Sequence, residues 1–222
     1  GISYLLILSI FLYFIFLKID LNRLNDFLYY KESQVNLESF ISENLYINLI
    51  LFSLFCIAWV ALLGFGSPLL IISGILFGKW VGTFISTISI SVGALILYSI
   101  TSFFFKDLVK KILEKKFLKY FYFFNKNEFY YFIIFRITGG LGIPFPLQNT
   151  LPVIFNIKKK NYFFASILGF VPGFFIWNTI GSGINKFIKD SENFSFLNLI
   201  LSREIYLPII LFLIFIIIST FI

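Results

Sequence analysis

The chain has 222 residues, of which 59% are hydrophobic and only 13% are charged, and its mean hydropathy is +0.94. Soluble domains carry about 25% charged residues, so this composition argues against a soluble globular enzyme. In a bilayer the same length supplies roughly five to seven spans of about 20 residues joined by short loops. We therefore expect an all-α polytopic membrane protein.

The chain contains no histidine and a single cysteine, Cys56. This excludes histidine-based triads, histidine general bases and most zinc or haem sites. One cysteine can form neither an internal disulfide nor a metal-binding cysteine cluster. No nucleophile–base pair is visible either, so we expect no enzyme activity, no cofactor and no metal.

The formal net charge is +7, from 18 Lys and Arg against 11 Asp and Glu. The basic residues lie between apolar runs rather than on one polar stretch. This placement favours anionic lipid headgroups as the partner, and we expect no binding to nucleic acid. A homo-oligomer is left open.

The first 44 residues are predicted to form one membrane helix, Ile2–Leu17, followed by a polar loop or surface helix over residues 18–44. Leu45–Leu63 is apolar and long enough to span a bilayer. It is followed by a cluster of helix breakers, Gly64-Phe-Gly66-Ser67-Pro68.

The apolar piece Leu69–Phe77 ends at Gly78-Lys79. As a helix it would be about 14 Å long, which is half the hydrocarbon core, so it cannot cross alone. The breaker cluster should therefore turn the chain back inside the membrane. Thr83–Phe105 is uncharged, rich in small residues and predicted to span the membrane.

Residues 106–128 carry seven lysines. Their apolar residues recur every three or four positions: Val109, Ile112, Leu113, Phe117, Tyr120 and Phe124. This pattern predicts an amphipathic helix on a membrane surface, with an ordinary solvated loop as the alternative. We expect residues 106–128 and 158–160 to contact anionic headgroups.

Phe129–Ile157 is apolar but contains a glycine- and proline-rich stretch near its middle. Both of its ends are strongly basic. The positive-inside rule places both ends in the cytoplasm, so this segment should enter and leave on one side. Irregular backbone at that depth requires surrounding protein or a water-filled cavity.

Asn161–Gly183 is predicted to be the next span, with breaks at Gly169, Pro172 and Gly173. A mixed-charge loop over residues 184–204 and a last span, Ile205–Ile222, follow.

The basic residues also bear on orientation. If 106–128 and 158–160 are cytoplasmic and Leu45–Leu63 crosses fully, thirteen Lys and Arg face inward and four face outward. If residues 45–78 form one long re-entrant hairpin, the division is ten against seven. The rule favours the first topology.

The two interrupted segments resemble each other at an offset of 76 residues, which aligns Pro68 with Pro144 and Gly93 with Gly169. Because they would enter from opposite sides, we predict an inverted repeat of two re-entrant helical hairpins, each followed by a transmembrane helix. Many transporters build a midplane site in this way.

Arg136 is the only charge between Phe129 and Ile157. A buried arginine costs a few kcal/mol or more, so it must find carbonyls, an anion or water. Its planar fork is suited to a phosphate. The alternative is that it only caps carbonyls at the break or snorkels to the surface.

Glycines and half-helix N-termini near Arg136 would let backbone approach an anion. Gln148 and Asn149 add uncharged polar groups, which could instead join helices. The residues predicted to form the re-entrant breaks are Gly66, Pro68, Gly74, Gly139, Gly140, Gly142, Pro144 and Pro146. We expect most of these to be scaffold.

No Asp or Glu lies well inside an apolar segment, and Glu43 at the start of the second run is the nearest. A proton relay normally needs an intramembrane carboxylate.

Together these motifs resemble the VTT-domain family, also called the DedA or SNARE-associated Golgi protein superfamily, and most closely its Tvp38-like branch. The resemblance runs through Ser67-Pro68 to Gly78, Phe132-x-x-x-Arg136, Gly139-x-x-x-Ile143-Pro144, Pro146-x-x-Asn149 and Gly169-Phe-Val-Pro172. It covers roughly residues 45–185, which leaves 1–44 and 186–222 as flanking regions.

This resemblance implies a pair of inverted re-entrant hairpins and transbilayer movement of phospholipid or a polyprenyl-phosphate carrier, in a bacterial cytoplasmic membrane. It also points to Phe132 and Arg136 as headgroup-binding residues, beside Gln148 and Asn149. Many bacterial members carry an acidic residue where this chain has Gly66-Ser67-Pro68, which counts against proton coupling there. The alternatives are an ion- or proton-coupled small-solute transporter and a non-transporting membrane organiser.

Overall fold

The computed structural model describes residues 27–62, 64–117, 121–191 and 195–220, and this part of the chain is helical, without strands. The all-α fold expected from the sequence is confirmed. The predicted first helix, Ile2–Leu17, lies outside the described residues. The helices are α2 (Phe27–Glu43), α3 (Leu45–Ala61), α4 (Gly66–Phe104), α5 (Lys106–Phe117), α6 (Phe121–Lys126), α7 (Glu128–Ile137), η3 (Gly139–Gly142), α8 (Phe145–Thr150), η4 (Leu151–Phe155), α9 (Lys159–Asp190), α10 (Phe196–Leu201) and α11 (Arg203–Thr220).

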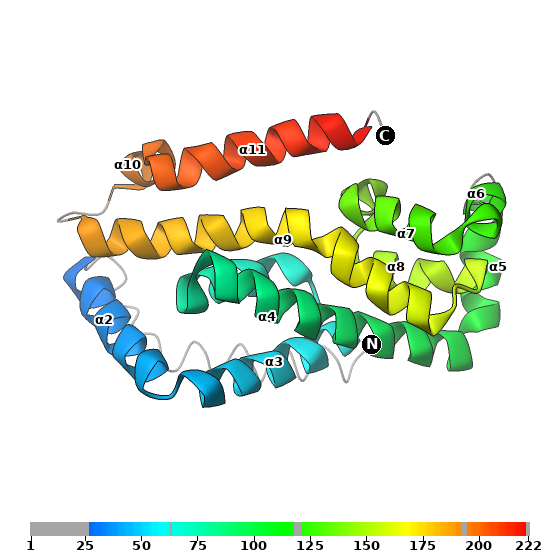
Figure 1. Cartoon of the computed structure of the whole chain (residues 1–222), viewed down its shortest axis with the longest axis horizontal. Coiled ribbons are helices and arrows are strands. Elements are labelled where there is room, and N and C mark those ends of the chain that lie inside the picture. Colours follow the sequence, from blue (N-terminus) through cyan, green and yellow to red (C-terminus); the bar gives the residue numbers. More distant parts are fainter. Residues whose placement is uncertain (1–26, 63, 118–120, 192–194, 221–222) are drawn as a thin grey trace.

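The first hairpin is formed by α3 and the first part of α4. Phe52 and Phe77 contact each other with 5.3 Å between ring centroids, so the two segments run antiparallel. At Gly78 a φ of 73° interrupts α4, which is therefore two helices, over 66–77 and 79–104. The chain turns at residues 62–65 and again at Gly78, as the breakers predicted (Figure 1).

This geometry bears on the two topologies considered for Leu45–Leu63. The residues that follow α3, Phe65 to Ser67, line a cavity together with Arg136 of α7. One face of α3, with Phe52, Cys56 and Val60, is buried against protein, whereas apolar residues such as Ile50 on its other face are exposed. Whether Leu45–Leu63 crosses the whole membrane or residues 45–78 form one re-entrant hairpin stays a prediction.

The second hairpin is formed by α7 and by α8 with η4. The carboxylate of Glu128, at the start of α7, accepts hydrogen bonds from the backbone N–H of Lys158 (3.3 Å) and from Nδ2 of Asn161 (2.5 Å). The segment therefore begins and ends at one end of the molecule, as its basic flanks predicted. The two hairpins come from opposite ends (Figure 1), while the inverted repeat of the sequence stays a prediction.

The two longest helices, α4 and α9, pack along each other in the centre (Figure 1). A Cβ on Gly74 would collide with the backbone of Asn178, and one on Gly181 with the carbonyl of Ile71. The sequence predicted a break at Gly74, and this prediction is wrong. Gly74 lies within a helical part of α4 and allows close packing against α9.

The breaks predicted at Gly169, Pro172 and Gly173 are also wrong, because α9 is one continuous helix with Pro172 inside it. A proline removes one hydrogen bond and bends a helix without having to end it. Figure 1 shows α9 bending along its length.

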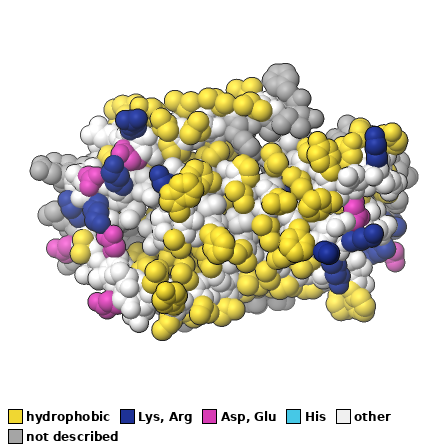
Figure 2. All heavy atoms as spheres, in the orientation of Figure 1, with side chains coloured by type: hydrophobic (Ala, Val, Ile, Leu, Met, Phe, Trp, Pro, Cys, Tyr) yellow, Lys and Arg dark blue, Asp and Glu magenta, His cyan; other side chains and the backbone are white. Residues whose placement is uncertain are grey.

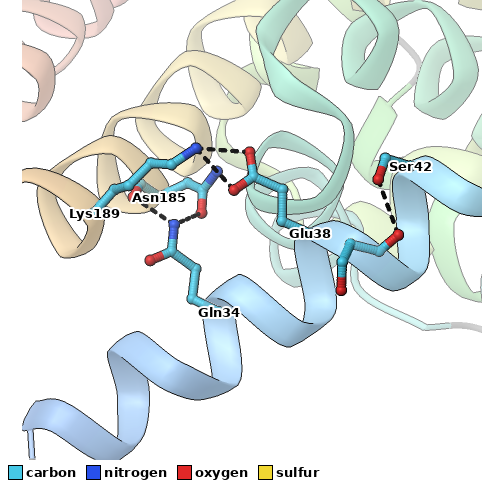
Figure 3. Close-up of polar contacts among 6 residues, drawn as sticks. Gln34, Glu38, Ser42, Asn185 and Lys189 are labelled. Carbon is cyan, nitrogen blue, oxygen red and sulfur yellow. Dashed lines mark hydrogen bonds and ion pairs between the residues drawn. The ribbon is translucent and has the colours of Figure 1, made fainter.

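Residues 31–43 belong to a surface helix, which was one of the two expectations for the polar stretch 18–44. Figure 3 shows how α2 is attached to the C-terminal part of α9: Gln34 Nε2 donates to Oδ1 of Asn185 (2.7 Å) and Lys189 pairs with Glu38 (2.8 Å). Lys31 also donates to the carbonyl of Ser191 (3.0 Å). Residues 31–43 lie at 102° to α3.

Charged side chains gather toward the two ends of the long axis, and hydrophobic side chains cover much of the surface between them (Figure 2). Phe84, for example, is 68% exposed. Among the described helices, α4 and α9 are long and apolar enough to cross a membrane, and the bent pair 31–43 and 45–61 would be a third. The protein is an integral membrane protein.

Within residues 106–128 the structure describes the helices α5 and α6 and the first residue of α7. Part of the predicted apolar stripe faces protein, because Val109 and Phe124 are buried and Phe124 stacks on Phe155 of η4 at 4.2 Å. The expected contact of these residues with anionic headgroups stays a prediction.

The close approach of α4 and α9 can be tested with two glycines of α9. We expect Gly181→Ala to destabilise the protein, by about 1–3 kcal/mol as for an overpacked core, because its methyl group meets backbone of α4. Gly173→Ala is the matched control, since a Cβ there meets no atom within 4 Å. Thermal unfolding in detergent measures both, and equal melting temperatures would contradict the packing argument.

Candidate functional site

A cavity of about 370 Å³ lies where the tips of the two hairpins meet. Phe65, Gly66 and Ser67 come from the first tip, residues between Arg136 and Gln148 come from the second, and α9 and α11 provide the other walls. The remaining described lining residues are Leu70, Arg136, Ile137, Thr138, Gly139, Gly142, Phe145, Gln148, Gly169, Phe170, Gly173, Phe174, Trp177 and Phe212. The cavity is thus mostly apolar and aromatic, with a few polar groups, as small-molecule sites commonly are.

Arg136, in the last turn of α7, is 3% exposed and lines this cavity. Its Nη2 donates to the hydroxyl of Tyr162 (2.7 Å) and its Nε to Oγ of Ser166 (3.2 Å). The rings of Phe132, Tyr162 and Phe170 lie 4.8, 5.2 and 4.5 Å from the guanidinium carbon, within cation–π range.

Nη1 of Arg136 is buried and has no hydrogen-bond partner among the described residues. Among the described residues no carboxylate pairs with this guanidinium, and none lines the cavity. An arginine cannot lose its proton in a protein, so the site carries a positive charge that no described carboxylate neutralises. Such a site is suited to an anion.

The backbone approach of α7 to α9 depends on Gly169. A Cβ at this position would collide with Cβ of Arg136 and lie 3.0 Å from the carbonyl of Ile133. Any larger residue would push α7 away and separate Arg136 from its partners on α9.

Gln148 closes the turn of the second hairpin and also lines the cavity. Its Nε2 donates to the carbonyls of Gly139 (2.8 Å) and Ile143 (2.6 Å). Gly139, Gly140 and Gly142 have φ values of 62°, 69° and 77°, which residues with a side chain rarely adopt. A Cβ on Gly140 would also collide with Gln148.

Phe132 and Asn149 are fully buried behind the cavity and are not among its described lining residues. The carbonyl of Asn149 accepts a hydrogen bond from Tyr162 (3.2 Å), and its Nδ2 has no partner in the part of the chain that the structure describes. The structure therefore brings Arg136 and Gln148 to the cavity surface, with Phe132 and Asn149 supporting them.

The remaining predicted break residues flank the tips. Gly66 and Pro68 lie in the first turn of α4, and Gly66 faces the ring of Phe145. Pro144 precedes α8, and Pro146 lies in its first turn. Prolines at these positions cost no hydrogen bond, because the first N–H groups of a helix lack intrahelical partners.

The VTT domain model matches residues 64–183, which is more than half of the chain. The chain belongs to the VTT domain family. The match spans both the second half of the first hairpin and the whole second hairpin, including Arg136. Assignment to the Tvp38-like branch stays a prediction, and no solved structure matches the chain.

Sequence reasoning missed the residues of α9 that hold Arg136 in this VTT domain. Tyr162, Ser166 and Phe170 recur every four positions and therefore share one helix face, on which Gly169 and Gly173 also lie. The hydroxyl groups of Tyr162 and Ser166, together with two glycines on the same face of an apolar span, could have indicated this role from the sequence.

The support of Arg136 can be tested with Tyr162→Phe. Removal of the hydroxyl leaves a second guanidinium N–H unpaired, so we expect a loss of about 1.5–3 kcal/mol, as for a hydrogen bond to a charged group. Tyr130→Phe is the control, because this ring is 55% exposed and its hydroxyl makes no hydrogen bond with the described residues. Denaturant or thermal unfolding in detergent measures the difference, and a Tyr162→Phe protein as stable as the control would contradict it.

Proposed function

We propose that this VTT-domain protein is a lipid translocase or scramblase that moves a phosphate-bearing lipid, either a phospholipid or a polyprenyl-phosphate carrier, across the bilayer. The observation that carries the proposal is Nη1 of buried Arg136, which has no partner in the described part of the chain and lies beside a cavity without described carboxylates. A guanidinium presents its donors in a fork that matches phosphate oxygens.

The remaining walls suit the headgroup region of a lipid. Thr138, Ser67 and Gln148 add polar groups to the lining, while the ring of Phe65 and aromatic rings of α8, α9 and α11 form much of its apolar part. A lipid phosphate bound at Arg136 would keep its tails in the bilayer and avoid the cost of carrying a bare charge through hydrocarbon.

We place the protein in a bacterial cytoplasmic membrane, with residues 106–128 and 158–160 toward anionic headgroups. The ten lysines of these two stretches support this orientation by the positive-inside rule. The alternative of a proton-coupled solute transporter is less favoured, because no described lining residue of the cavity is a carboxylate.

Proteoliposomes containing a fluorescent phospholipid or polyprenyl phosphate test the proposal through the rate at which the label crosses the bilayer. We expect Arg136→Ala to lower this rate at least about tenfold, which corresponds to loss of about 1.4 kcal/mol of phosphate binding in the crossing state. Arg136→Lys keeps the charge without the fork and should retain an intermediate rate.

Gly173→Leu is a second variant that leaves Arg136 intact. A Cβ at Gly173 meets no atom within 4 Å, so a leucine would extend into the cavity without displacing protein. We expect it to slow transport, whereas Lys189→Gln, far from the cavity, should not. Transport at the wild-type rate in both Arg136→Ala and Gly173→Leu would contradict the proposal, and gradient-driven solute flux without lipid movement would support the transporter alternative.

A further inference from the structure

A second pocket, which is basic, lies at the end of the molecule opposite to α5. Its volume is about 280 Å³, and it is enclosed by the turn after Gly78, the C-terminal part of α9 and the start of α11. The described lining residues are Lys79, Thr179, Ser182, Gly183, Lys186, Arg203, Glu204, Leu207 and Pro208.

Three of these residues are basic and come from three different segments: Lys79, Lys186 and Arg203. Glu204 is the one carboxylate among the described lining residues, and Lys186 already pairs with it at 2.8 Å. Lys79 and Arg203 have no ion-pair partner among the described residues. The pocket therefore has two positive charges that are free to meet a ligand.

The other walls are of two kinds. Thr179 and Ser182 contribute hydroxyl groups, whereas Leu207 and Pro208 form an apolar wall on α11. Leu207 is 43% exposed and is followed along α11 by further exposed apolar residues, among them Ile210. A ligand with an anionic end and an apolar end would fit this arrangement.

The walls are held together by close packing. A Cβ on Gly183 would lie 2.5 Å from the carbonyl oxygen of Glu204, so α9 and α11 are in direct backbone contact here. The positions of Lys186 and Glu204 therefore follow from the packing of the two helices.

We propose that this pocket binds the phosphate group of an anionic lipid headgroup at the membrane surface opposite to α5. Basic pockets between membrane helices bind such headgroups, and an arginine fork beside a lysine point charge is suited to phosphate oxygens. The inference goes beyond the proposed function, because it concerns equilibrium binding and holds whether or not the protein moves lipid.

The test uses the full chain purified in detergent and fluorescence anisotropy with labelled phosphatidylglycerol as the probe. We expect Lys79→Gln with Arg203→Gln to weaken binding roughly 30-fold, from about one fivefold factor per basic residue near an anionic headgroup. The matched control is Lys31→Gln with Lys189→Gln. It removes the same charge at the same end, but Lys31 bonds to Ser191 and Lys189 to Glu38, and neither residue lines the pocket.

Glu204→Gln provides a test in the opposite direction and does not depend on the stability of the double variant. It removes the carboxylate and releases Lys186, so we expect binding about fivefold tighter. Glu38→Gln is its control, because it breaks an ion pair at the same end outside the pocket and should leave the affinity unchanged.

Competition identifies the source of the phosphate. Displacement of the probe by inorganic phosphate would show that the phosphate group alone is recognised, and displacement only by unlabelled phosphatidylglycerol would show that the acyl chains are needed as well. The proposal would be overturned if the pocket and control double variants weakened probe binding equally. It would also be overturned if Lys79→Gln with Arg203→Gln left the affinity unchanged, or if Glu204→Gln did. Arg136 is intact in all of these variants, so failure of the cavity proposal would not change the comparison.

Discussion

The cost of keeping the charge of Arg136 out of water sets the constraint on which the centre of this molecule depends. Transfer of an ion from water to a protein interior costs several kcal/mol unless hydrogen bonds and nearby charges compensate for it. Here the compensation comes from one face of α9, through Tyr162 and Ser166, and from three aromatic rings. Because Gly169 lets the two backbones touch, α7 can lie close enough for these contacts.

A second constraint is that chain reversals inside an apolar molecule leave carbonyl and N–H groups without helical partners. Side chains satisfy part of this need at each tip: Gln148 donates to two carbonyls of the second turn, and Trp59 donates to the carbonyl of Phe65 at the first. The tips also cover each other, since Gly66 faces Phe145. The cavity is the space that remains between the two tips. The candidate site therefore results from the way in which the two turns pack against each other.

These constraints explain which features the sequence could predict. A lone arginine in an apolar segment, a nine-residue apolar piece that is too short to cross, and basic residues at both ends of 129–157 all depart from the pattern of a simple spanning helix, so each could be singled out from the sequence. Gly74 and Gly169 were misread because a glycine that permits close packing looks the same in sequence as one that breaks a helix. The path of Leu45–Leu63 stays a prediction, because apolarity does not distinguish contact with lipid from contact with protein. Tyr162 could not be assigned without its partner, because an aromatic residue in an apolar run is expected anyway.

Helix α9 connects all of these parts and is continuous with Pro172 inside it. It holds Arg136 in its N-terminal third, packs on α4 through Gly181, and carries the contacts with α2 and α11 near its C-terminus. Gly173 at the cavity and Ser182 at the basic pocket are separated along this helix by about 14 Å, at 1.5 Å per residue. Since the hydrocarbon core is about 30 Å thick, a basic pocket at the membrane surface would place the cavity near the midplane. A headgroup in the cavity would then be about equally far from both surfaces, which is where a phosphate has the greatest need of a fixed positive charge.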